Sequence, residues 1–243
     1  MPATLEQLTG AFTEQFARLR EWLEPLGDTL GGAAQLPSSR TGWSNRELVV
    51  EIGTSVQSLI NAEPAPAGTT PLSLGEYTGH DSDFDAELTQ RVQAQAAGLT
   101  QGVLEYLEEM HTRATANLLA LGDDDDSVVL GALGPIRLGD LVRTRLLDLV
   151  TYTLDLEASA AGRMDLSAGN TPVHVPALRL VADELLDIVA SRGGYHLEVV
   201  DARMWTRLAT GREPYNTLAL TSAIQPTDTA GGVPDLGRVL PLI

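Results

Sequence analysis

Chemistry-bearing residues stand out in the segment from residue 143 to residue 156, which reads RTRLLDLVTYTLDL. Asp148 and Tyr152 are four residues apart in this segment, and in an α-helix two such side chains lie on the same face. A carboxylate is a ligand that zinc accepts, whereas a phenol is a poor replacement for the imidazole or thiolate that zinc prefers. The spacing therefore places a carboxylate and a phenol on one face of an expected helix, and this pair alone would bind zinc poorly.

A second segment, residues 42 to 53, reads GWSNRELVVEIG and places Glu51 near the end of an expected helix. Together the two segments resemble the mycothiol-dependent maleylpyruvate isomerase family, a branch of the DinB-like four-helix bundles. The family patterns are Gly-Trp-Ser/Thr-x-x-x-Leu-x-x-His-Leu-Gly and Arg-x-x-acid-x-x-x-His-x-x-Asp-Leu. Gly42, Trp43, Ser44, Leu48 and Gly53 match the first pattern, and Arg145, Asp148, Asp155 and Leu156 match the second, while the two histidine positions hold Glu51 and Tyr152.

The resemblance implies that the family's metal-ligand positions fall on Glu51, Asp148 and Tyr152. It also implies that Asp155 and Arg145 orient those ligands. Two of the three positions have changed residue type and the third has a shorter carboxylate, so we expect a degraded metal site. The sequence identifies no catalytic residue and no residue that binds an organic cofactor.

Two functions remain open at this point. The first is a non-catalytic protein that binds a small molecule or a partner and holds no cofactor. The alternative is an active thiol-dependent isomerase or transferase, which would use mycothiol and a divalent metal. The family's metal is zinc, but an oxygen-rich ligand set would favour a hard cation such as Mg²⁺ or Ca²⁺.

A second resemblance rests on two C-terminal segments, WTRLATGR at 205–212 and DLGRVLPL at 235–242, and on PLSLGEY at 71–77. These resemble the bacterial sterol-carrier-family proteins that are fused to this type of bundle. We therefore expect a mainly α protein with two domains. Residues 1–165 would form the DinB-like four-helix bundle, and residues 172–243 a short sterol-carrier-like α+β subdomain.

Apolar periodicity and capping residues predict the elements of this fold. Thr4 with Gln7, and Ser44 with Glu47, have the spacing of capping boxes. The expected helices cover 4–24, 45–61, 84–121 with a break near Gly98 and Gly102, and 140–161 with Asp140 as its cap. A hairpin is expected at 128–138, then a helix at 177–191, a strand at 195–200 and a helix at 202–210.

Composition excludes several classes of chemistry. The 243 residues include no cysteine and no lysine, so disulfides, thiolate ligands and Schiff-base catalysis are ruled out. A net charge of −17 opposes binding to nucleic acid, and no apolar run is long enough to insert into a membrane. We expect a soluble cytoplasmic monomer or homodimer that takes a small-molecule ligand.

The four histidines do not supply the missing imidazole ligands, because no two of them have the sequence spacing of a metal-binding pair. His80 falls in an expected loop, and His174 and His196 lie beyond the bundle. For His111, on the third expected helix, we predict a packing or surface role.

Overall fold

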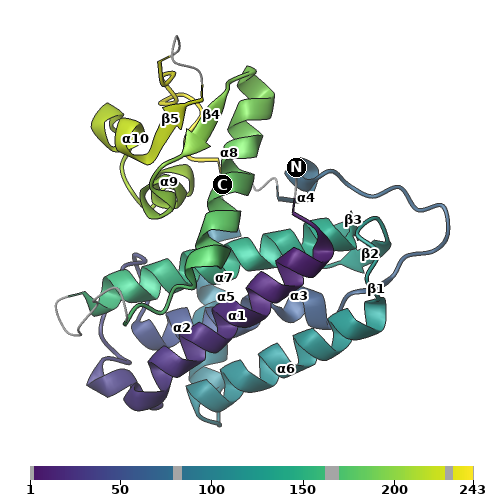
Figure 1. The fold of residues 1–243 in the computed structure, drawn as a ribbon. Helices are drawn as coiled ribbons and strands as arrows, with labels where there is room; N and C mark the ends of the chain where they lie inside the picture. The colour runs from purple at the N-terminus through teal and green to yellow at the C-terminus, as the bar shows by residue number, and fades with distance from the viewer. Residues whose placement is uncertain (1–2, 79–83, 162–169, 228–231, 243) are drawn as a thin grey trace. The chain divides into compact units, whose positions relative to one another are not determined.

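The computed structural model describes residues 3–78, 84–161, 170–227 and 232–242 (Figure 1). The chain divides into two compact units, here called the N-terminal unit (Ala3–His174) and the C-terminal unit (Val175–Ile243). Each unit is described by itself. Residues 162–169, where the first predicted domain ends, lie outside the described residues, and the two-domain assignment stays a prediction.

The N-terminal unit is mainly helical, as expected. Its helices are α1 (Leu5–Leu23), α2 (Asn45–Ser55), α3 (Gln57–Ile60), α4 (Leu74–Thr78), α5 (Phe84–Gly98), α6 (Val103–Leu121) and α7 (Leu138–Ala160), with 3-10 turns η1 (Glu24–Leu26) and η2 (Leu30–Gly32). The strands β1 (Glu63–Pro64), β2 (Val128–Gly131) and β3 (Gly134–Arg137) form an antiparallel sheet in the order β1-β2-β3. The β2–β3 pair is the predicted hairpin.

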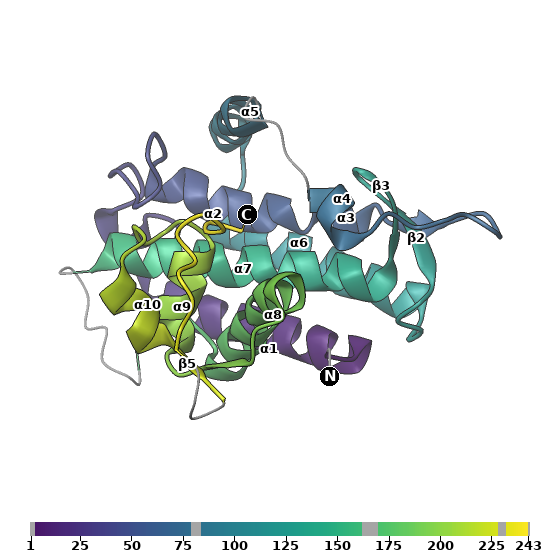
Figure 2. The same cartoon turned by 90° about the horizontal axis from the view of Figure 1, so that it is seen from above.

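The long helix α7 lies at the centre of this unit, between α1 and α2 (Figure 2). Helix α6 contacts α1, α2 and α3, and α5 packs against α2. The core between these helices is built mostly from leucine, and several of its side chains are fully buried: Leu8, Leu19, Leu48, Leu141, Leu146 and Leu149. Burial of each such side chain contributes about 1.5–3 kcal/mol, so this leucine core holds α7 against its neighbours.

Both predicted capping boxes are present, at Thr4 of α1 and at Ser44 of α2. The helix predicted to run from 45 to 61 is interrupted, which corrects the prediction: α2 ends at Ser55 and α3 begins at Gln57. The carbonyl oxygen of Ser55 accepts a hydrogen bond from Arg145 Nη1 at 3.0 Å. The Ser55 carbonyl, which would bond within the helix if α2 continued, is thus bonded to Arg145 of α7 instead. The local sequence does not reveal this contact.

The expected break near Gly98 is confirmed, since α5 ends there and α6 begins at Val103. Gly102 offers no side-chain cap, and Asp28 Oδ1 instead accepts from the N–H of Leu104 at 3.1 Å. The carboxylate of a distant loop therefore caps α6.

The prediction that Asp140 caps the fourth helix is wrong. Helix α7 begins two residues earlier, at Leu138, with Arg137 as its N-cap residue. The N–H of Leu138 donates to the carbonyl of Ser127, the residue before β2, at 2.8 Å, so this helix-end donor is satisfied without a side-chain cap. Asp140 lies in the first turn and forms an ion pair with Arg143 at 2.5 Å.

The C-terminal unit contains α8 (Val175–Gly193), β4 (Leu197–Val199), α9 (Ala202–Ala209), α10 (Thr217–Ala223) and β5 (Ile224–Pro226), with β4 and β5 antiparallel. The first three are the predicted helix, strand and helix, while α10 and β5 were not predicted. Trp205 of α9 is fully buried and donates from Nε1 to the carbonyl of Ala182 at 3.0 Å. Near the end of the chain, the N–H of Leu242 donates to the carbonyl of Ala209 at 2.8 Å. Whether this unit is sterol-carrier-like stays a prediction.

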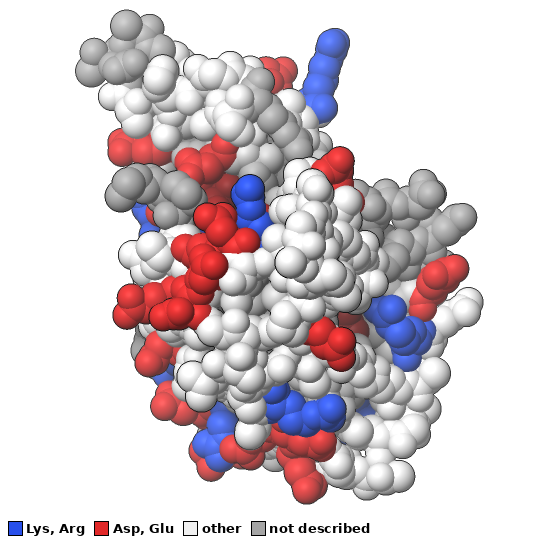
Figure 3. Space-filling model, turned by 90° about the vertical axis from the view of Figure 1, so that its right-hand side faces the viewer, with Lys and Arg blue, Asp and Glu red and all other residues white. Residues whose placement is uncertain are grey.

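Charged side chains lie over the surface drawn in Figure 3, with carboxylates spread among the arginines. The whole chain has 33 acidic and 16 basic side chains. None of the helices among the described residues is long and apolar enough to cross a membrane.

Candidate functional site

The structure brings Glu51, Asp148 and Tyr152 into one region of the N-terminal unit. Glu51 lies on α2, the other two lie on α7, and these two helices pack against each other. Glu51 is 4% exposed and Tyr152 8%, while the side chain of Asp148 remains 29% exposed. The sequence-predicted positions therefore form a buried polar cluster that reaches solvent at Asp148.

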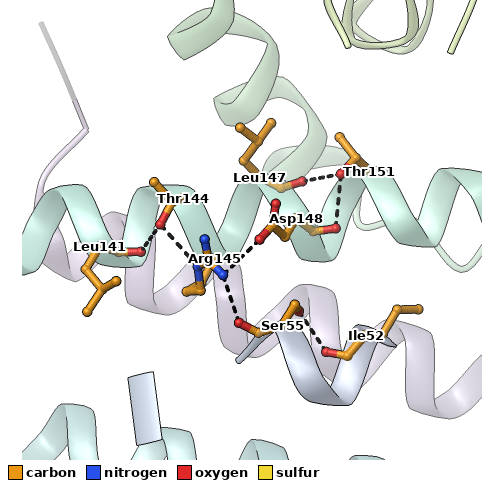
Figure 4. Close-up of polar contacts among 8 residues, drawn as sticks. All are labelled: Ile52, Ser55, Leu141, Thr144, Arg145, Leu147, Asp148 and Thr151. Carbon is orange, nitrogen blue, oxygen red and sulfur yellow. Dashed lines mark hydrogen bonds and ion pairs between the residues drawn. The ribbon is translucent and has the colours of Figure 1, made fainter. Parts of the chain in front are cut away.

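Asp148 is engaged in an ion pair with Arg145, one helical turn before it (Figure 4). Arg145 Nη1 lies 3.0 Å from Asp148 Oδ2 and also donates to the carbonyl of Ser55 at 3.0 Å. Its Nε donates to Thr144 Oγ1 at 3.1 Å. Arg145 thus connects α7 to the end of α2, and it neutralises the carboxylate that the family resemblance assigns to a metal.

Glu51 is the most perturbed carboxyl group of the site. Burial, followed by the negative charge of Asp148, raises the pKa of Glu51 to about 7, and Arg91, Arg40 and Arg145 act against this rise. Its Oε2 is buried and has no hydrogen-bond partner among the described residues. At neutral pH the carboxyl group therefore exists as a mixture of its neutral and ionised forms.

Arg40 enters the site from the loop that precedes α2. Its guanidinium carbon lies 4.3 Å from the centre of the Trp43 ring and 5.6 Å from that of Tyr152. The adjacent Ser39 donates from Oγ to the carbonyl of Asp155 at 2.7 Å, which attaches the loop to α7. Trp43 is buried and donates from Nε1 to Thr89 Oγ1 of α5 at 3.0 Å. The cation of Arg40 is thereby held over two aromatic rings.

Tyr106 of α6 is a further polar residue of this region that sequence reasoning missed. Its hydroxyl accepts from Gln95 Nε2 at 2.6 Å and lies 3.2 Å from Thr54 Oγ1. Burial raises the pKa of Tyr106, the hydrogen bond to Thr54 lowers it, and the charge of Glu51 raises it again. Gly53 is required beneath this ring, because a Cβ there would lie 2.6 Å from Tyr106 Cε1.

The two residues expected to orient metal ligands have different surroundings. Arg145 contacts Asp148 directly, as described above. Asp155 is 8% exposed, and its carbonyl accepts from Ser39 and, at 2.7 Å, from Ser159 Oγ. A role for the Asp155 carboxylate in orienting a ligand stays a prediction.

His111 is placed away from this cluster, between α6 and α1. Its ring stacks on Phe16 with a centroid separation of 3.7 Å, and Phe12 lies 5.6 Å away. Burial lowers the pKa of His111 to about 4, so the ring is neutral at physiological pH. This is the predicted packing role. His80 lies outside the described residues.

The donor set does not fit zinc. It offers a carboxylate already paired with Arg145, a phenol, and a buried carboxyl group. The guanidinium groups of three arginines lower the pKa of Glu51, and their positive charge would repel a metal cation bound at the same place. Among the described residues, no group of three or more His, Cys, Asp or Glu side chains could hold a metal ion.

Comparisons with known proteins define the class of fold. No protein-family model matches the chain, and no curated protein matches it. Two solved structures do: the mycothiol-dependent maleylpyruvate isomerase, with a TM-score of 0.57, and a histidine-to-alanine mutant of that enzyme, with a TM-score of 0.56. Each is 16% identical and covers 96% of this chain and 95% of its own. At this identity the likeness shows that the chain shares the fold of that isomerase.

Proposed function

We propose that the chain is a divergent member of the mycothiol-dependent maleylpyruvate isomerase family with a degraded metal site, built on a DinB-like four-helix bundle. It acts without catalysis, by binding a small molecule or a partner. It does not bind nucleic acid and does not insert into a membrane. It is a monomer or a homodimer. The C-terminal unit is assigned as a short sterol-carrier-like subdomain.

The observation that carries this proposal is the ion pair of Asp148 with Arg145. Arg145 Nη1 occupies Asp148 Oδ2 at 3.0 Å and compensates the charge of the carboxylate, so a metal would have only Oδ1 as its ligand and a weaker attraction to it. The remaining family positions, Glu51 and Tyr152, supply no imidazole to compensate for that loss. The binding function therefore agrees better with the local charges than metal-dependent catalysis does.

The alternative is an active metal-dependent isomerase or transferase that uses mycothiol at an oxygen-rich site. One observation favours it: Glu51 and Asp148 are near enough that the charge of Asp148 raises the pKa of Glu51. A hard divalent cation relieves repulsion of this kind between carboxylates.

Elemental analysis of the protein, purified without a chelator, separates the two functions. We expect no stoichiometric zinc, magnesium or calcium. One bound metal per chain that is lost in Asp148→Asn, a variant that keeps the side-chain shape, would overturn the non-catalytic proposal.

A second variant tests the alignment itself. Glu51→His combined with Tyr152→His restores both imidazoles on helices that face each other, and we expect it to gain zinc affinity in a calorimetric titration. The matched control adds Asp148→Asn to the pair and should lose that gain. A folded double variant without zinc affinity would show that these positions do not correspond to the family's ligands.

A further inference from the structure

The three-stranded sheet of the N-terminal unit has a buried face and an exposed face. Val129 and Ile136, which pair across β2 and β3, are buried and form the inner face. Successive residues of a strand point to opposite faces, so Leu130 lies on the outer face, opposite Glu63 of β1. Leu130 is 40% exposed, and Leu133, in the turn between β2 and β3, is 51% exposed. The sheet therefore presents two large apolar side chains to solvent.

Acidic residues accompany these leucines. The loop from Asp123 to Asp126 leads into β2, and all four of its aspartates are exposed. With Glu63 of β1 and Arg137 of β3, the sheet and this loop carry five carboxylates and one guanidinium group, a net charge of −4. On the side of the molecule where Figure 1 draws the sheet, Figure 3 shows uncharged surface beside carboxylates.

The aspartates of the loop differ in their contacts. Asp124 Oδ2 accepts from Ser127 Oγ at 3.0 Å, and Asp126 pairs with Arg137 at 3.5 Å. For the carboxylates of Asp123 and Asp125, the described part of the chain shows no hydrogen bond or ion pair. These two carboxylates can therefore pair with an incoming cation without breaking an existing contact.

The charge of this surface selects its partner. An apolar centre with a polar rim is the usual anatomy of a protein–protein contact. A second copy of the chain would bring a further −4 against the first, and each chain carries −17 in total, so repulsion opposes self-association through this face. A basic partner is attracted instead. Lysine and arginine suit the surface because their aliphatic stems cover apolar groups while their charged ends reach carboxylates.

We propose that the outer face of the β1-β2-β3 sheet is a docking surface for a basic, partly apolar segment of another protein. The apolar side chains of that segment cover Leu130 and Leu133, and its lysines or arginines pair with Asp123 and Asp125. The surface shares no residue with the cluster of Glu51, Asp148 and Tyr152, so the inference goes beyond the proposed function and does not depend on whether that cluster holds a metal.

Fluorescence anisotropy at low ionic strength tests the surface with short labelled peptides of leucine and lysine, one with helical periodicity and one with strict alternation. We expect at least one of them to bind saturably with one site per chain, and to bind more weakly as salt is added, because the carboxylates are exposed. A lysine–serine peptide of equal charge should bind more weakly, because it has no apolar side chains to cover the leucines. A glutamate–leucine peptide should not bind.

One double variant tests the apolar contribution. Leu130→Ser with Leu133→Ser should weaken binding of the leucine–lysine peptide about tenfold, because the exposed parts of two leucine side chains are no longer available for burial. The matched control is Leu218→Ser, at a leucine of the C-terminal unit that is 82% exposed, and it should bind like the wild type.

A second double variant tests the charges. Asp123→Asn with Asp125→Asn should weaken binding about fivefold at low salt, because two exposed ion pairs are lost, and this effect should diminish at high salt. The matched control is Glu6→Gln with Glu14→Gln, which removes two exposed carboxylates from α1 and leaves the same net charge.

Circular dichroism first shows that each variant is folded. The inference is overturned if neither leucine–lysine peptide binds saturably, or if either double variant weakens binding no more than its control. It is also overturned if the lysine–serine peptide or spermine binds as tightly as the leucine–lysine peptide, since the apolar face would then contribute nothing. A halving of the sedimentation mass in the Leu130→Ser, Leu133→Ser variant would show instead that this face joins two copies of the chain.

Discussion

Replacing Glu51 with glutamine is expected to stabilise the protein increasingly as the pH rises. The pKa of Glu51 is raised from 4.5 to about 7 in the folded protein, mainly by burial. A raised pKa means that the folded state binds the proton more tightly than the unfolded state does. The stability that this proton confers is present in full below pH 4.5 and is lost as the pH rises through 7.

The magnitude follows from this shift. At about 1.4 kcal/mol per pKa unit, the full loss is about 3 kcal/mol, and most of it, about 2–3 kcal/mol, falls between pH 5 and pH 8. Glutamine has nearly the shape of the neutral acid and does not ionise. The free energy of unfolding of Glu51→Gln, relative to wild type, should therefore increase by about 2–3 kcal/mol over this range.

Urea unfolding of both proteins at pH 5, 6, 7 and 8 measures this difference. Glu14→Gln, at an exposed position of α1, is the matched control and should follow the wild-type curve. A difference between wild type and Glu51→Gln that stays constant with pH would refute the reasoning. A difference that shrinks as the pH rises would show that the three arginines outweigh burial.

Two further substitutions test the packing within the N-terminal unit. His111→Phe removes a ring whose pKa is lowered to about 4 by burial, so wild-type stability should fall relative to the variant as the pH drops from about 6.5 towards 4. From the pKa shift, the loss of wild-type stability between pH 7.5 and pH 5 is about 2 kcal/mol, or about 1 kcal/mol once solvent screening of the half-buried ring is included. Free energies of unfolding from urea that differ by the same amount at every pH would contradict this prediction. Gly53→Ala should cost about 1–3 kcal/mol in thermal unfolding, because the new Cβ would lie 2.6 Å from Tyr106 Cε1. Gly10→Ala, on an exposed turn of α1 with nothing within 4 Å, should instead gain about 0.5–1 kcal/mol, and equal effects at the two glycines would refute the steric argument.

The elements that the sequence predicts well are those fixed by neighbouring residues. The capping boxes at Thr4 and Ser44 satisfy helix-end donors within three residues, so their signal is local. The end of α2 and the start of α7 were predicted wrongly because distant groups decide them. Arg145 takes the carbonyl of Ser55, and Ser127 accepts from Leu138.

The candidate site divides in the same way. The i, i+4 relation of Asp148 and Tyr152 follows from helix geometry alone, and the motif match adds Glu51. Arg40, Arg91 and Tyr106 carry no such signal, because a loop and two other helices bring them to the cluster. A glycine inside a helix, as at Gly53, indicates that another group packs closely against it. The sequence does not say that this group is the ring of Tyr106.

On the proposed function, the charges of the cluster explain how Glu51, Asp148 and Tyr152 keep their places without a metal ion. A buried carboxyl group such as Glu51 needs compensation, and guanidinium groups supply it without an ion from solution. Arg145 does this for Asp148 and also joins α7 to α2, so the two helices keep their facing positions. A divalent cation would bring two more positive charges close to three guanidinium groups. On the proposed function, the arginines thus take over the compensation of Glu51 and Asp148 that a metal ion would otherwise supply.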